Sequence, residues 1–93
     1  MLVHLSIHTP KQGKEPDLIA SMHRFGAAAE GAPGFVDAGV LRDRRSGRLV
    51  GIARWEDEES WRAGVERMRA AVAEDPFDQW EAQETESFVL DEV

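Results

Sequence analysis

The sequence predicts an α+β fold of the ferredoxin-like βαββαβ type, with two helices on one face of a four-stranded antiparallel sheet. Two observations indicate the elements. Short segments with apolar residues at every second position alternate with longer segments whose apolar residues are spaced by four, three and four. A polar turn containing Ser46-Gly47 joins two of the short segments as an antiparallel hairpin. With 93 residues, we expect one domain over residues 1–93.

The beginning of the chain supplies a strand, a loop and a helix. Val3, Leu5 and Ile7 alternate with polar residues, which is typical of a half-buried strand. A polar loop follows over residues 9–16, and the helix begins near Pro16, because proline is favoured in a first helical turn. Its apolar stripe consists of Leu18, Met22, Phe25 and Ala29, widened by Ile19, and it ends before Gly31, Pro33 and Gly34.

The remaining elements are a hairpin, a second helix and a last strand. Residues 35–42 and 49–55 form the hairpin strands. Asp57 is placed to cap the next helix, whose acidic first turn suits the positive end of the helix dipole. The apolar stripe of that helix is Trp61, Val65, Met68 and Val72, and Pro76 ends it. We expect one more helical turn at residues 77–80 and a strand at residues 85–90.

Alternation divides the sheet residues into two faces. We assign to the helix-covered face Val3, Leu5, Ile7, Val50 and Ile52. The open face then carries Leu2, His4, Ser6, His8, Gly51, Ala53 and Trp55. Because this face would leave apolar side chains in water, we expect a second copy of the chain to cover it and to close a barrel with a mixed polar and aromatic interior.

Composition excludes several partners. The net charge of −7 argues against nucleic acid, which needs a basic surface. Residues 1–55 carry 8 basic and 5 acidic side chains, and residues 56–93 carry 3 basic and 13 acidic ones. This uneven distribution indicates either an acidic solvated surface or acidic and basic edges that meet in a dimer. We see no signal peptide, no membrane span and no cysteine, and we expect a cytoplasmic protein without membrane partners.

Three short motifs occur in a fixed order: Gly-Lys-Glu at 13–15, Pro-Gly-Phe at 33–35, and Ala-Arg-Trp-Glu-Asp-Glu-Glu at 53–59. In this order and spacing, the chain resembles the antibiotic-biosynthesis-monooxygenase (ABM) type of dimeric α+β barrel over nearly its whole length. The resemblance implies a homodimer with a pocket in each subunit. The family includes cofactor-free oxygenases of phenolic polyketides, heme-degrading enzymes and proteins of unknown role.

The resemblance assigns roles to few residues. Trp55 matches a tryptophan at the strand-to-helix junction, which borders the active site in several members, and Ser6 lies where the heme-degrading branch has an asparagine. That branch also needs a histidine on or after the second helix, whereas this chain has none beyond His23. The quinone-forming branch uses pocket tyrosines, and this chain has no tyrosine. We therefore expect no cofactor, and the resemblance implies a fold and a pocket more firmly than a reaction.

His4 and His8 are the candidate catalytic bases, since imidazole titrates near neutral pH. They lie on one side of the first strand about 13 Å apart, so one metal ion cannot bind both and no metal site is expected. The alternative is that both are polar lining residues. His23, off the centre of its helical stripe, is expected at the surface or packed at the edge of the stripe. Arg54 is expected to extend its charged end from the apolar layer to water or to pair with an acid.

Aromatic residues are the candidate substrate contacts, together with Ser6. The flat ring of Trp55 suits stacking on an aromatic ligand, or else it is part of a dimer core. Phe77 and Trp80 either roof the pocket or pack the dimer.

The function these features favour is that of a cofactor-independent monooxygenase acting on a small aromatic or enolisable molecule. A phenol or enol that loses a proton becomes electron-rich and reacts with oxygen directly, so the protein needs a base, a clamp and a dry pocket. The alternatives are a non-catalytic ligand-binding or stress-related barrel and a structural dimer with a filled interior. A cavity below roughly 100 Å³ would favour the filled interior, because ligand sites usually measure about 300–1,000 Å³.

Overall fold

The computed structural model describes residues 1–93 and has the predicted order of elements. The strands are β1 (Leu2–His8), β2 (Phe35–Arg42), β3 (Leu49–Trp55) and β4 (Glu86–Asp91). The helices are α1 (Glu15–Ala27), α2 (Glu58–Ala71) and α3 (Phe77–Trp80). The hairpin and the short helix have their predicted limits, whereas α2 ends at Ala71, before Pro76 is reached.

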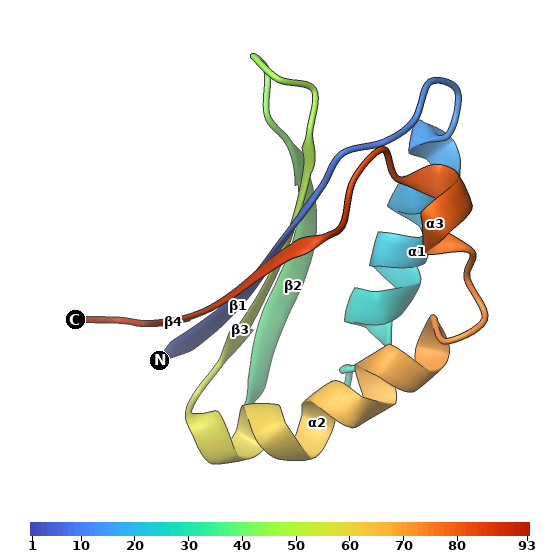
Figure 1. Ribbon diagram of the computed structural model, residues 1–93. Helices are drawn as coiled ribbons and strands as arrows, with labels where there is room; N and C mark the ends of the chain where they lie inside the picture. The colour runs from blue at the N-terminus through green and yellow to red at the C-terminus, as the bar shows by residue number, and fades with distance from the viewer.

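The strands form one antiparallel sheet in the order β2-β3-β1-β4, and the helices cover one face of it (Figure 1). The other face has no element over it. The two ends of the chain lie side by side, since the Glu92 amide donates to the Met1 carbonyl at 3.0 Å. The helix α2 begins as predicted, with the Asp57 carboxylate accepting from the Ser60 amide at 2.8 Å.

The assignment of the two sheet faces from the sequence is wrong. Leu2, His4, His8, Ala53 and Trp55 lie beneath the helices, and the Trp55 side chain is 0% exposed. Register pairs show the same arrangement, because Leu2 faces Trp55 and His4 faces Ala53 across β1 and β3. Alternation separates two sets of residues, but it does not say which set meets the helices.

Trp55 is buried because α2 offers it space. A Cβ atom added to Gly64 would lie 2.3 Å from Cη2 of the indole, so the absence of a side chain at Gly64 lets the ring lie against the helix backbone. Leu2, Ala29, Ala53 and Met68 complete this part of the core. Trp55 is thus a core residue within one subunit.

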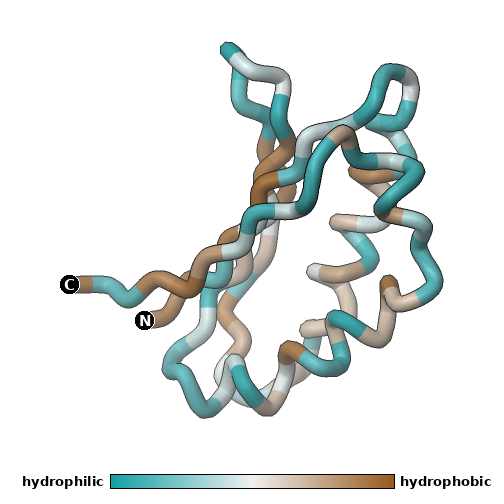
Figure 2. The backbone as a smooth tube through the Cα atoms, viewed as in Figure 1, coloured by the Kyte–Doolittle hydropathy of each residue, from teal (hydrophilic) through white to brown (hydrophobic).

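The uncovered side of the sheet is the apolar one, and we call it the apolar sheet face. It carries the half-buried residues Val3, Leu5, Ile7, Val50 and Ile52 and the exposed residues Leu41, Phe88 and Leu90. Hydrophobic segments run along the paired strands in Figure 2. Arg54 pairs with Asp37 at the edge of this face, as expected for an arginine beside an apolar layer.

The second part of the core joins α1 to the hairpin and to α3. Leu18, Met22 and Leu49 are buried there, and Phe77 and Trp80 pack against them. None of the helices is long and apolar enough to span a bilayer.

Candidate functional site

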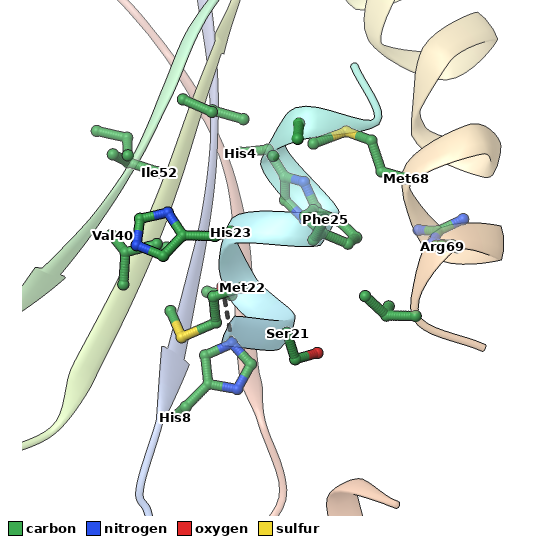
Figure 3. A pocket seen from close by; sticks show the side chains of 18 of the residues that line it. His4, His8, Ser21, Met22, His23, Phe25, Val40, Ile52, Met68 and Arg69 are labelled. Carbon is green, nitrogen blue, oxygen red and sulfur yellow. Dashed lines mark hydrogen bonds between the residues drawn. The ribbon is translucent and has the colours of Figure 1, made fainter. Parts of the chain in front are cut away.

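A cavity of about 560 Å³ lies between the helix-covered face of the sheet and helices α1 and α2 (Figure 3). Met22 and Phe25 of α1 form one wall, and Met68 of α2 with Val72, the residue directly after that helix, forms another. The volume falls within the range of about 300–1,000 Å³ that ligand sites occupy. The space between the sheet and the helices of one subunit is therefore not filled by the chain's own side chains.

The structure brings together four of the six residues predicted for the site. His4, Ser6, His8 and Phe77 line the cavity. Trp55 does not, because it lies under α2 in the core, and Trp80 packs beside Leu18 and Leu49 instead of roofing the space. The inverted sheet explains the difference: the polar residues of β1 face the interior of one subunit and not a partner's sheet.

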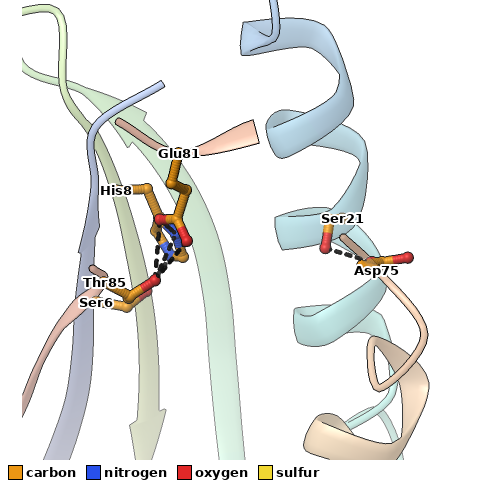
Figure 4. Close-up of polar contacts among 6 residues, drawn as sticks. All are labelled: Ser6, His8, Ser21, Asp75, Glu81 and Thr85. Atoms are coloured by element: carbon orange, nitrogen blue, oxygen red, sulfur yellow. Dashed lines mark hydrogen bonds and ion pairs between the residues drawn. The ribbon is translucent and has the colours of Figure 1, made fainter. Parts of the chain in front are cut away.

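His8 is held by a buried carboxylate. Its Nδ1 lies 2.7 Å from Oε1 of Glu81, and both side chains are buried (Figure 4). Thr85 donates its hydroxyl to the same carboxylate at 2.8 Å and 2.9 Å. On the other side of the ring, Nε2 lies 3.0 Å from Oγ of Ser6.

These contacts assign the hydrogen atoms. A carboxylate only accepts, so the His8 Nδ1 carries a proton and donates it to Glu81. In neutral His8, Nε2 then holds a lone pair and accepts from the Ser6 hydroxyl. The imidazole therefore presents its basic nitrogen to the cavity while Glu81 fixes its orientation, which is the arrangement of a general base.

His4 lies further along β1 in more apolar surroundings. Its Nε2 is 3.2 Å from Oγ of Ser87, and its ring packs against Phe25 and Trp61, with centroids 6.1 Å and 5.7 Å away. Burial lowers the pKa of His4 below its usual value, and the nearby positive charge of Arg69 lowers this pKa further. His4 is thus neutral at pH 7 and acts as a hydrogen-bonding residue.

Small residues keep the floor of the cavity open. A Cβ added to Gly51 would lie 2.7 Å from Oγ of Ser6 and 3.3 Å from Cε of Met22. Gly51 is the cross-strand partner of Ser6, so its lack of a side chain leaves room for the hydroxyl that contacts His8.

A second polar contact closes the cavity at α1. The buried hydroxyl of Ser21 donates to Oδ2 of Asp75 at 2.6 Å, and Arg24 pairs with the same carboxylate. The hydrogen bond from Ser21, followed by the contact with Arg24, lowers the pKa of Asp75. This contact ties α1 to the segment after α2. His23, exposed as expected, lies at the edge of the cavity.

Sequence reasoning missed Glu81, Thr85, Ser87 and Ser21. Ser87 would have been found by pairing β4 with β1 in register, because it faces Ser6, and Thr85 lies two residues before it, just ahead of the strand. Glu81 carries no such signal, since it is one of many acidic residues in the last part of the chain. It is positioned by a bridge to Pro10, which no local pattern reveals.

Comparison with known proteins rests on structure alone. No protein-family model matches the chain, and no curated protein does. Among solved structures, an antibiotic biosynthesis monooxygenase superposes with a TM-score of 0.76 at 16% identity, over 100% of this chain and 99% of its own. SnoaB, a cofactor-independent oxygenase from Streptomyces nogalater, gives 0.77 at 18% identity, over 98% of this chain and 91% of its own.

This chain has the ABM fold. A third structure with that fold is MhuD, solved with two manganese protoporphyrin IX groups per active site; it gives a TM-score of 0.76 at 20% identity, over 100% of this chain and 95% of its own. In this chain α2 presents Met68 and Arg69 to the cavity, and Val72 follows directly after the helix; none of these side chains is an imidazole. No residue of α2 or of the chain after it could ligate an iron through an imidazole, because the last histidine of the chain is His23.

Proposed function

We propose that this chain is a cofactor-independent monooxygenase that acts on a small aromatic or enolisable molecule bound between the sheet and the helices. The observation that carries the proposal is the His8–Glu81 pair, a buried and oriented base at the wall of a cavity large enough for such a molecule. The fold that the chain shares with a cofactor-independent oxygenase adds support.

The chemistry required of the protein is the removal of one proton. A phenol or enol placed beside Ser6 gives its proton to Nε2 of His8, which becomes an imidazolium. The buried carboxylate of Glu81 stabilises that cation, and the Thr85 hydroxyl holds the carboxylate in place. The substrate anion is then electron-rich enough to react with dioxygen.

The overall reaction balances without a cofactor. A ring methylene gains one oxygen atom as a carbonyl, and the second oxygen atom leaves as water with the two hydrogen atoms of the methylene. Met22, Phe25 and Met68 supply apolar walls on the helix side of the space beside the anion. His4, neutral and bonded to Ser87, offers a second polar contact to the substrate.

Oxygen uptake with a panel of anthrones and hydroquinones tests this function. We expect turnover by the wild type and a fall of about 100-fold or more in Glu81→Gln and His8→Gln, the range in which general bases contribute. Glu84→Gln is the matched control, because Glu84 is exposed and lies outside the cavity. Thermal stabilisation by these compounds without oxygen uptake would favour the ligand-binding alternative.

We propose in addition that two copies pair through the apolar sheet face. Leu41, Phe88 and Leu90 are 56%, 42% and 45% exposed there, beside five half-buried aliphatic residues. Patches of this kind mark association surfaces in soluble proteins. In sedimentation equilibrium we expect a dimer for the wild type and a monomer for Leu5→Glu, while a monomeric wild type at micromolar concentration would refute the pairing.

A further inference from the structure

Ser6, His8 and Glu81 form a continuous hydrogen-bonded line (Figure 4), and Ser6 and His8 also line the cavity. A hydroxyl, an imidazole and a carboxylate in this order are the parts of an activated serine nucleophile. We propose that Ser6 is the nucleophile of an acyl-transfer site that hydrolyses small carboxylic esters. The inference uses the same His8–Glu81 pair as the proposed oxygenase, but it assigns a different reaction.

The directions of the hydrogen bonds suit this role. Glu81 accepts from Nδ1 of His8 at 2.7 Å, which leaves Nε2 to accept the Ser6 hydroxyl proton at 3.0 Å. The carboxylate also accepts from Thr85, so it is fully bonded although it is buried. Gly51 opposite Ser6 leaves the hydroxyl open to the cavity, where an ester carbonyl can approach it.

A donor for the developing oxyanion lies on the neighbouring strand. Ser87 of β4 faces Ser6 of β1 in register, and residues paired in this way have Cβ atoms about 4.5–5.5 Å apart. The Ser87 hydroxyl is bonded to Nε2 of His4 at 3.2 Å. When the neutral imidazole donates this N–H to Ser87, the Ser87 O–H is free to donate to the oxyanion.

The steps balance within the site. Oγ of Ser6 forms a bond to the carbonyl carbon as its proton moves to Nε2 of His8. The tetrahedral intermediate collapses, the C–O bond to the alcohol breaks, and His8 returns the proton to the leaving alcohol. Water, activated by the same imidazole, then cleaves the acyl-serine ester and releases the acid.

Covalent labelling tests the inference. The purified chain is incubated with a short-chain alkyl fluorophosphonate, and the adduct is located by intact-mass and peptide mass spectrometry. We expect one adduct per chain on Ser6, no adduct in Ser6→Ala, and labelling slowed by about 100-fold or more in His8→Gln. Ser46→Ala, which removes an exposed serine of the hairpin turn, is expected to label like the wild type.

A second substitution at Ser6 separates loss of the nucleophile from loss of folding. Ser6→Cys keeps a nucleophile next to His8, and we expect p-nitrophenyl acetate to acetylate it at this position; absence of this acetylation in the folded variant counts against the inference. A folded wild type that gains no adduct, or an adduct that persists in Ser6→Ala, overturns it. Labelling without oxygen uptake refutes the oxygenase alone, and oxygen uptake without labelling refutes the acyl-transfer site alone.

Discussion

Replacing Gly64 by alanine tests how closely α2 lies on Trp55. The added Cβ would be 2.3 Å from Cη2 and 2.8 Å from Cζ3 of a fully buried indole. Carbon atoms pack at about 3.5–4.0 Å, so the helix or the ring must move by roughly 1 Å. Overpacking of this kind costs about 1–3 kcal/mol, and the severity of the contact places Gly64→Ala near the upper end.

Alanine also recovers about 1 kcal/mol of helix propensity relative to glycine. We therefore expect a net loss of about 2 kcal/mol in the free energy of unfolding, which lowers Tm by roughly 8–16 °C in a domain of this size. Urea unfolding followed by far-ultraviolet circular dichroism at fixed protein concentration measures this loss.

The matched control is Gly26→Ala in α1. There the added Cβ would lie 3.1 Å from Cβ of Ala38, a contact that a shift of a few tenths of an ångström relieves. The gain in helix propensity offsets that shift, so we expect a change within about 0.5 kcal/mol. If Gly64→Ala is as stable as the wild type, α2 is not seated on Trp55 as described.

Three further changes test the core and the site. Burial lowers the pKa of His4 below 6.5, so the unfolded chain binds the proton first as the pH falls. The free energy of unfolding therefore falls below about pH 6.5. In thermal unfolding, His4→Gln should weaken the dependence of Tm on pH in this range, whereas His23→Gln should leave it unchanged. Leu18→Ala removes a side chain that is 0% exposed and should cost about 2–5 kcal/mol in urea unfolding. Gly51→Ala places a methyl group 2.7 Å from Oγ of Ser6 and should slow fluorophosphonate labelling with little change in Tm, because the methyl group turns the hydroxyl away from the base.

The order of the elements and several of their limits could be predicted from the sequence because the signals are local, whereas the end of α2 could not. The alternation of residues 49–55 predicts β3, and Asp57 with its acidic neighbours predicts the start of α2. Leu18, Met22 and Ala29 of the predicted stripe are buried, and Ile19 and Phe25 are half-buried. Each of these signals depends on residues within one or two turns of each other.

The face of the sheet depends on packing between distant elements and could not be predicted in this way. Val50 and Ile52 have the side chains expected of core residues. Trp55 is buried in their place because Gly64, within the following helix, leaves space for its ring. The candidate site shows the same limit. His4 and His8 were identified from residue type, whereas Glu81 is recognised only when the loop before β4 pairs with Pro10.

The His8–Glu81 pair is assembled from opposite ends of the polypeptide. His8 lies near the N-terminus, and Glu81 and Thr85 belong to the segment that precedes the last strand, so most of the chain separates the imidazole from its carboxylate. During translation, the His8 imidazole is therefore synthesised long before Glu81, and the two side chains can pair only when synthesis is almost finished. A ribosome that stalls before residue 81, or a protease that removes the segment from residue 81 onward, leaves a chain that has the residues of both long helices but no carboxylate beside His8.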